Sequence, residues 1–104
     1  MNFKKVKIEI FIPAEYTNKL REELNNIGAL GVGNYDNVIS ITKIKGYWRP
    51  LVGANPFDGK INEISEANED KIEFSTDIKN IENIIKVIKE VHPYEEPVIN
   101  IIPL

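Results

Sequence analysis

The sequence predicts one α+β domain, residues 1–104, in which two helices cover one face of a four-stranded antiparallel sheet. Apolar residues alternate with polar ones in four extended segments, and they recur every three or four residues in two helical segments. The order of these segments is β-α-β-β-α-β, which is typical of the ferredoxin-like sandwich. At 104 residues the chain has the length of one domain with one core.

The expected strands share an alternation of β-branched and polar residues, and turn-forming residues bound most of them. They cover residues 3–12, 38–45, 60–66 together with 70–76, and 98–104. The third segment does not alternate strictly between Ile61 and Ile64, so it is either a hairpin or one bulged strand. Lys4, Lys5 and Lys7 fall on the first strand, and we interpret them as lysines that protect an exposed sheet edge.

The two amphipathic helices are expected near residues 14–28 and 78–91. Gly28 fits a left-handed C-cap of the first helix, and Asp77 or Asn80 fits the N-cap of the second. Since both helices cover the same face of the sheet, apolar residues on its other face need a different cover, and a subunit contact is the simplest one. The residues expected there are Phe11, Val38 or Ile39, and Ile99 or Ile102.

Composition excludes several classes of function. The formal net charge of −3, without a basic stripe interleaved with aromatics, argues against nucleic-acid binding. No apolar run is long enough to span a bilayer, and residues 1–12 lack the apolar core of a secretory signal, so we expect a cytoplasmic protein. Because the chain has no cysteine, thiolate zinc sites, iron–sulfur clusters and thiol nucleophiles are excluded.

Catalytic chemistry has little support in the sequence. His92 is the only histidine, and it stands outside any triad-like context. Adjacent acids such as Glu69 and Asp70 are interpreted as solvated surface of an acidic chain rather than as an acid–base pair. We therefore assign no catalytic residue.

Residues 46–59 form a long irregular segment with three glycines and two prolines, and it carries the bulky side chains of a Trp and a Phe. Loops of this length are uncommon and usually carry a function or an interface. Trp48 and Phe57 would pave a ligand pocket, with Arg49 as partner of a carboxylate or phosphate. Burial of the same aromatic residues against a neighbouring subunit explains the composition equally well.

The segment from His92 to Pro97 places one imidazole and the carboxylates of Glu95 and Glu96 within five residues. These donors suit a divalent ion such as Zn²⁺ or Cu²⁺. A structural role is the alternative, because a histidine at a helix C-terminus interacts favourably with the helix dipole and the two prolines set a rigid turn. Both roles remain open at this stage.

Three blocks of the sequence, taken together and in order, resemble the insert domain of the YqfO-type, Nif-three-like proteins, also known as type-2 GTP cyclohydrolase I. The blocks are Gly31-x-Gly33-Asn34-Tyr35, Trp48-Arg49-Pro50-Leu51-x-Gly53-Ala54-Asn55-Pro56-Phe57-x-Gly59, and His92-Pro93-Tyr94-Glu95-Glu96-Pro97. The last block is also similar to a motif of CutA, the divalent-cation tolerance protein. The resemblance implies a CutA-like, PII-like ferredoxin fold and, through CutA, a tight homotrimer. It also implies that the two-metal site of full-length members lies in flanking domains, which need several histidines where this chain has one.

Together these observations predict a stand-alone, trimeric module that binds a small molecule or a divalent metal ion and has no catalysis of its own. The alternatives are a metal-dependent hydrolase with a site shared between subunits, and a purely structural assembly domain. The candidate ligand-binding residues are Asn34, Tyr35, Trp48, Arg49, Asn55 and Phe57. The candidate metal ligands are His92, Glu95 and Glu96.

Overall fold

A computed structural model describes residues 4–104, so Phe3, the expected start of the first strand, lies outside the described residues. The elements follow one another in the predicted order, each helix being preceded by a 3₁₀ turn. They are β1 Lys5–Pro13, η1 Ala14–Tyr16, α1 Thr17–Asn26, β2 Ser40–Trp48, β3 Ser65–Asp77, η2 Ile78–Asn80, α2 Ile81–Val91 and β4 Ile99–Pro103.

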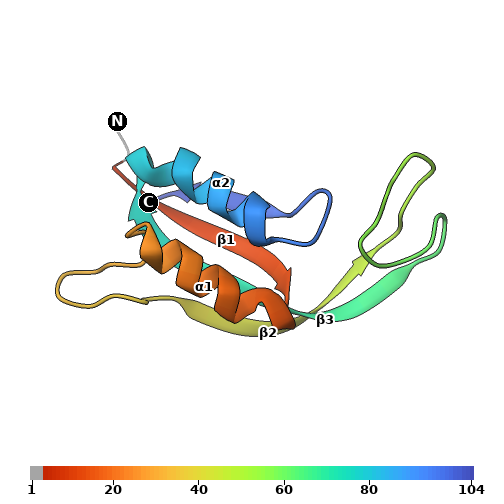
Figure 1. Ribbon diagram of the computed structural model, residues 1–104, viewed down its shortest axis with the longest axis horizontal. Helices are drawn as coiled ribbons and strands as arrows, with labels where there is room; N and C mark the ends of the chain where they lie inside the picture. Colours follow the sequence, from red (N-terminus) through yellow and green to blue (C-terminus); the bar gives the residue numbers. More distant parts are fainter. Residues whose placement is uncertain (1–3) are drawn as a thin grey trace.

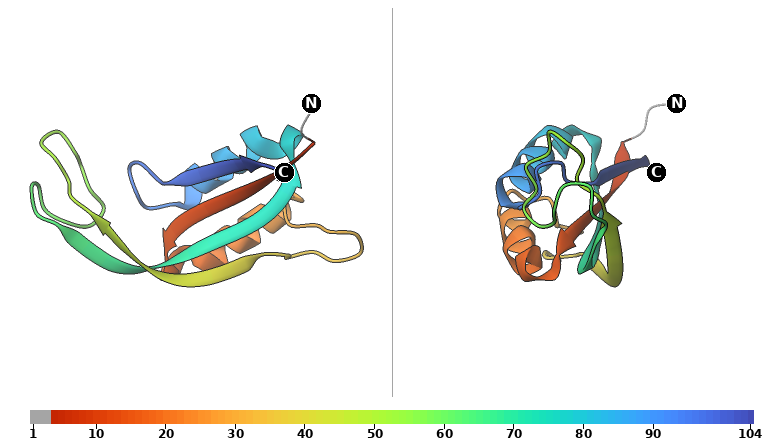
Figure 2. Two further views of the ribbon diagram at one scale, coloured as in Figure 1. Left: turned by 180° about the vertical axis from the view of Figure 1, so that it is seen from behind. Right: turned by 90° about the vertical axis from the view of Figure 1, so that its right-hand side faces the viewer.

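The sheet is antiparallel throughout and has the strand order β2-β3-β1-β4. β1 pairs with β3 along its whole length, from Lys5 opposite Asp77 to Pro13 opposite Glu69. Both helices lie side by side on one face of the sheet (Figure 2). This arrangement confirms the predicted ferredoxin-like sandwich.

The core lies between the helices and the inner face of β1 and β3. Side chains of the same parity along β1 point inward, because successive residues of a strand alternate between the two faces. They meet the apolar stripes of α1 and α2, and the most deeply buried members are Val6, Ile8, Ile10, Ile12, Leu20, Leu24, Ile84 and Ile88. After α1, Gly28 has a φ of 79°, which confirms the left-handed C-cap. No helix within residues 4–104 is long and apolar enough to cross a membrane.

The first strand is central rather than at an edge, so the interpretation of its lysines as edge protection is wrong. β1 lies between β3 and β4, and its outer face carries Lys7 beside Glu9. The Lys7 ammonium lies 2.8 Å from a carboxylate oxygen of Glu73 and 3.3 Å from one of Glu9, while Lys71 lies 3.4 Å from Glu9. The middle of the open sheet face is therefore an ionic network and not an apolar surface.

The apolar residues expected on the open face are divided between both faces. Ile39 and Ile99 pack against the core instead. Val38 and Ile102 remain exposed. The open face therefore exposes less apolar surface than the sequence predicts, and that surface is confined to the ends and edges of the sheet.

β2 and β3 continue beyond the rest of the sheet as an arm, which projects on one side of the molecule (Figure 1). β2 reaches Trp48, so it extends into the segment expected to be loop, and β3 is one strand that begins at Ser65. Cross-strand pairing explains both differences, because Gly46, Tyr47 and Trp48 pair with Ala67, Glu66 and Ser65. Periodicity along one strand contains no information about its partner, so the sequence did not reveal the arm.

Candidate functional site

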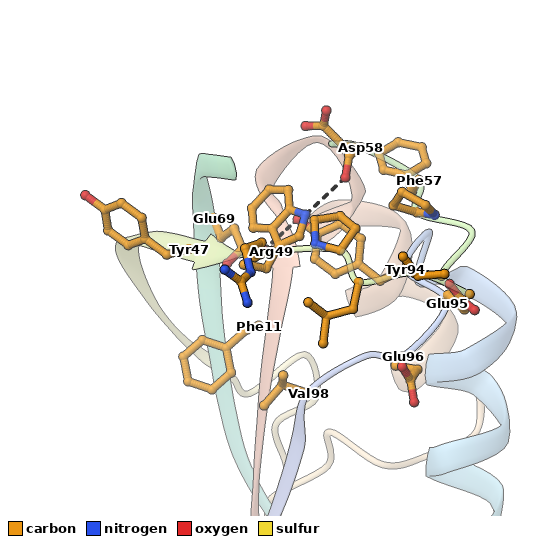
Figure 3. A pocket seen from close by; sticks show the side chains of 17 residues that line it. Phe11, Tyr47, Arg49, Phe57, Asp58, Glu69, Tyr94, Glu95, Glu96 and Val98 are labelled. Carbon is orange, nitrogen blue, oxygen red and sulfur yellow. Dashed lines mark hydrogen bonds between the residues drawn. The ribbon is translucent and has the colours of Figure 1, made fainter. Parts of the chain in front are cut away.

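The arm faces the segment that follows α2, and an open pocket of about 520 Å³ lies between them (Figure 3). One wall comes from the end of β2 and the loop after it, and the other from the turn between α2 and β4. Phe11 of β1 and Glu69 of β3 also line it. The predicted residues Trp48, Arg49 and Phe57 line the same pocket as Glu95 and Glu96.

Aromatic rings hold the two walls together. The ring of Tyr94 packs against Trp48 with centroids 5.7 Å apart and against Phe57 with centroids 6.2 Å apart. Phe57 in turn meets Tyr16 edge-on at 6.0 Å. The indole N–H of Trp48 donates a hydrogen bond of 3.0 Å to the carbonyl oxygen of Asp58, which fixes the path of the loop. Trp48 and Phe57 therefore pack against rings of their own chain, whereas Tyr47 is exposed.

Glu69 lies beneath this aromatic wall and is only 6% exposed. The hydroxyl of Tyr94 donates a hydrogen bond of 2.7 Å to one of its carboxylate oxygens. Burial and the neighbouring Glu69 carboxylate raise the pKa of Tyr94 far above its usual value, so the phenol remains a proton donor at neutral pH. The other carboxylate oxygen lies over Gly46, where an added Cβ would be 2.0 Å away from it.

The interpretation of Glu69 and Asp70 as solvated surface is wrong for both residues. Asp70, on the helix-facing side of β3, is 2% exposed and accepts hydrogen bonds from the Thr17 hydroxyl at 2.6 Å and the Lys43 ammonium at 2.7 Å. Burial opposes ionisation of this carboxyl, but the bonds from Lys43 and Thr17 hold the pKa of Asp70 below its usual value. The signal in the sequence is the alternation of β3, which places Asp70 on the same face as Ile72 and Phe74.

His92 is buried behind Tyr94 and makes two hydrogen bonds to the main chain. Its Nε2 lies 2.7 Å from the carbonyl oxygen of Phe11, and its Nδ1 accepts a 3.1 Å hydrogen bond from the backbone N–H of Tyr94. Since Nδ1 is the acceptor, Nε2 carries the proton and donates it to Phe11. While both bonds persist, His92 has no nitrogen free for a metal ion, which favours the structural role over the role of ligand.

Glu95 connects the turn after α2 to the loop of the arm. One of its carboxylate oxygens accepts a 2.9 Å hydrogen bond from the backbone N–H of Asn55. Asn55 therefore takes part through its main chain. In the part of the chain that the structure describes, no three histidine, aspartate or glutamate side chains are grouped closely enough to hold a metal ion.

Asn34 and Tyr35 lie apart from the pocket, in the loop between α1 and β2 at the opposite end of the sheet (Figure 1). There the backbone groups of Val32 and Tyr35 pair with each other at 2.8 and 2.9 Å, and the Tyr35 side chain is largely exposed. The structure thus brings together the second and third sequence blocks but not the first. Sequence reasoning missed Glu69 and Tyr94 as pocket residues.

The fold is of the CutA-like kind. The structure of CutA from Archaeoglobus fulgidus, described as a periplasmic divalent cation tolerance protein, superimposes with a TM-score of 0.72 over 96% of this chain and 83% of that chain, at 19% identity. A Bacillus cereus protein related to NIF3 gives a TM-score of 0.84 at 24% identity and covers 98% of this chain but 26% of that chain. Both comparisons describe the fold.

Sequence relatives match the same region of longer proteins. Over 98 residues, 94% of this chain, it is 33% identical to the GTP cyclohydrolase 1 type 2 homolog of Staphylococcus epidermidis and 34% identical to that of Halalkalibacterium halodurans. The chain spans only about a quarter of the length of these relatives (27% and 26%). No protein-family model matches it. This chain is therefore similar to one region of the Nif-three-like proteins, which confirms the resemblance seen in the sequence motifs.

Proposed function

We propose that this chain is a trimeric module that binds a small ligand in the pocket between the arm and the turn after α2, and that it regulates rather than catalyses. The observation that carries the proposal is the pocket itself, in which two sequence blocks far apart in the chain meet around about 520 Å³. This volume is in the range of small-molecule sites. Its walls combine aromatic faces with Arg49 and the carboxylates of Glu95 and Glu96, a pattern suited to orienting one ligand.

Assembly into a trimer is supported by the apolar residues that a single chain leaves exposed. They gather at the arm and along β4, at the two ends of the strand order. Their more exposed members are Val52, Ile64, Val98, Ile101, Ile102 and Leu104. Surfaces of this kind are usually covered by a partner, and homo-oligomers with cyclic symmetry are the commonest solution.

Absence of catalysis is part of the proposal. The relatives of this chain are named for a GTP cyclohydrolase homologue, but the match covers only about a quarter of them. Of residues 4–104, those that line the pocket include no serine, threonine, cysteine, lysine or histidine, and the raised pKa of Tyr94 makes its phenol a poor nucleophile beside Glu69. We expect no turnover of GTP above the buffer rate, with magnesium, manganese or zinc present.

Native mass spectrometry of the protein purified from its source tests the proposal directly, because it reports subunit number and retained ligand together. We expect a trimer that carries a small additional mass. Replacing Trp48 by alanine opens the pocket and should release that mass, whereas Tyr35→Ala, an aromatic truncation at the opposite end of the sheet, should not. A ligand-free monomer, or a mass that survives Trp48→Ala, would refute the pocket as the binding site.

A divalent ion is the second candidate for the ligand, because the fold relatives include proteins described by their tolerance of divalent cations. Glu95 and Glu96 would supply the oxygen donors, and His92 would join them only by giving up the hydrogen bond from the Tyr94 N–H. Calorimetric titration with zinc and copper(II) on the wild type, on Glu95→Gln with Glu96→Gln, and on His92→Ala separates these roles. Binding that persists in both variants would show that any metal site lies outside this turn.

A further inference from the structure

Acidic side chains outnumber basic ones around the pocket. Among the described residues that line it, the acids Asp58, Glu69, Glu95 and Glu96 face one cation, Arg49. Glu95 is occupied in part by the Asn55 N–H, and Glu96 lies on the same turn after α2 (Figure 3). The electrostatic field inside the pocket is therefore that of an excess of negative charge, which attracts a cation.

Glu69 is the most buried of these acids, and no described residue acts as its counter-ion. It is 94% buried, its hydrogen bond is the one from Tyr94, and within residues 4–104 it takes part in no salt bridge. Asp70, the next residue along the chain, has both a lysine and a threonine as partners. A buried carboxylate without a cation is unfavourable unless another group compensates its charge. The pocket is the side from which such a group can reach it.

The walls above Glu69 are the faces and edges of aromatic rings. Trp48, Tyr94 and Phe57 form a continuous set with centroid distances of 5.7 and 6.2 Å, and Phe11 and Tyr47 also line the pocket. Aromatic faces attract organic cations, most strongly when the cation is desolvated, and a nearby carboxylate adds an attraction between opposite charges. Inorganic ions gain less from such walls because they keep their hydration shell.

We propose that the ligand of this pocket is an organic cation, namely an amine or quaternary ammonium with an apolar body; this inference rests on the proposed function. Its charge is neutralised by Glu69, which lies behind the rings of Trp48, Tyr94 and Phe57. The pocket volume of about 520 Å³ suits a free small molecule of this kind. Arg49, at the side of the pocket, then favours ligands that also carry an anionic group away from the ammonium.

Trp48 is the only tryptophan of the chain, so its fluorescence reports this pocket alone. We expect tetraethylammonium chloride to change it saturably, while potassium chloride at the same ionic strength does not. Glu69→Gln should raise the dissociation constant by about tenfold or more, because the cation loses its buried partner. Glu82→Gln removes the same charge from an exposed position at the start of α2 and should leave the constant unchanged.

Phe57→Ala keeps every charge and removes one aromatic wall, so it should weaken tetraethylammonium binding. It tests the inference independently if Glu69→Gln disturbs folding. Far-UV circular dichroism checks the fold of each variant. Saturable binding of inorganic phosphate in place of tetraethylammonium would overturn this inference and leave the proposed function standing. A Trp48 signal that changes with protein concentration, and that neither tetraethylammonium nor phosphate alters, would assign the pocket to a second copy of the chain and would overturn both.

Discussion

His92 is held at both ring nitrogens by main-chain groups, and through them it joins the end of β1 to the turn that carries Tyr94 and Glu95. The carbonyl oxygen of Phe11 and the N–H of Tyr94 are its partners. The histidine thus positions the pocket from behind rather than lining it. A residue type that suggests catalysis or metal binding in a sequence is here a connector between two backbone segments.

Truncating this connector should destabilise the protein. In His92→Ala both backbone partners lose their hydrogen bonds in a largely buried place, and a cavity replaces the ring, so we expect a loss of about 2–4 kcal/mol in the free energy of unfolding. Urea denaturation at pH 7.5 measures it. Asn83→Ala, an exposed change on α2, serves as control and should stay within about 0.5 kcal/mol of the wild type. Equal stability of His92→Ala would mean that these hydrogen bonds are absent in solution.

The same residue predicts a pH dependence. Burial lowers the pKa of His92 from its ordinary value of 6.5, although the Phe11 carbonyl and Glu69 act in the opposite direction. The unfolded chain therefore binds the proton more readily than the folded one below about pH 6.5, and stability is full above that pH and falls as pH drops toward the lowered folded pKa. We expect the wild type to lose more stability than His92→Gln between pH 7.5 and 5. Parallel pH profiles of the two proteins would show that His92 does not titrate differently on folding.

A glycine is required at position 46 because the Glu69 side chain leaves no room for a Cβ, and not because of the backbone conformation of Gly46. An added Cβ would lie 2.0 Å from a carboxylate oxygen of Glu69, so alanine would push that carboxylate out of place and away from Tyr94. We expect Gly46→Ala to cost about 1–3 kcal/mol of stability and to weaken ligand binding in the pocket. Gly31→Ala is the matched control, because the nearest atoms there are 3.9 Å away. Thermal unfolding and Trp48 fluorescence measure the two effects.

At the scale of the elements, Asp70 joins three of them. Thr17 at the start of α1 and Lys43 of β2 both bind this carboxylate of β3. The position at the first turn of α1 also allows the carboxylate to interact favourably with the positive end of the helix dipole. A polar contact in the core thereby fixes where α1 begins over the sheet.

Removing the hydroxyl of this contact tests it. Thr17→Val keeps the shape of the side chain but leaves one oxygen of a buried carboxylate without its donor, so we expect a loss of about 1–3 kcal/mol. It should also raise the pKa of Asp70, so that the variant loses further stability at a higher pH than the wild type on acidification. Thr42→Val, at an exposed position of β2, should be nearly neutral. Denaturation midpoints at pH 7 and pH 4 give both comparisons.

The elements themselves were largely predictable. The alternation of Val6, Ile8, Ile10 and Ile12 and the three-to-four spacing of Leu20 and Leu24 are local patterns that burial on one face imposes, and the structure confirms them. The extent of the arm was not predictable, since it depends on which residues pair across β2 and β3. Strand order was also missed, and with it the central place of β1. The length of the arm and the strand order both depend on contacts between residues far apart in the sequence, so local patterns do not reveal them.

The pocket was predictable in its parts and not as a whole. Its unusual composition singled out Trp48, Arg49 and Phe57, and the structure places all three around one cavity. Glu69 was not recognised because an acid next to another acid looks solvated until the strand partners are known. Asn34 and Tyr35, grouped with the site through the motif blocks, lie at the other end of the sheet.

For the whole molecule, the open sheet face is covered in its middle by paired charges, which indicates that contacts between copies form elsewhere. The lysines and glutamates of β1 and β3 already satisfy one another there. Among residues 4–104 the outer edge of β4 has no partner strand, and it carries exposed aliphatic side chains. An unpaired strand edge of this kind is a ready surface for association.

A trimer formed through the β4 edge should therefore be sensitive to a charge at Ile102, which is 38% exposed and lies opposite Lys7. In a single chain, Ile102→Glu places its carboxylate near that lysine and should be tolerated, so it should shift the protein from trimer to monomer without unfolding it. Ile78→Glu, at an isoleucine 46% exposed on the helix layer, should leave the trimer intact. Light scattering during size exclusion measures the mass, which we expect to be three times 11.9 kDa for the wild type and for Ile78→Glu, and 11.9 kDa for Ile102→Glu. A wild-type monomer at micromolar concentration would remove the trimer from the proposed function, and a trimeric Ile102→Glu would place the subunit contact on the arm instead.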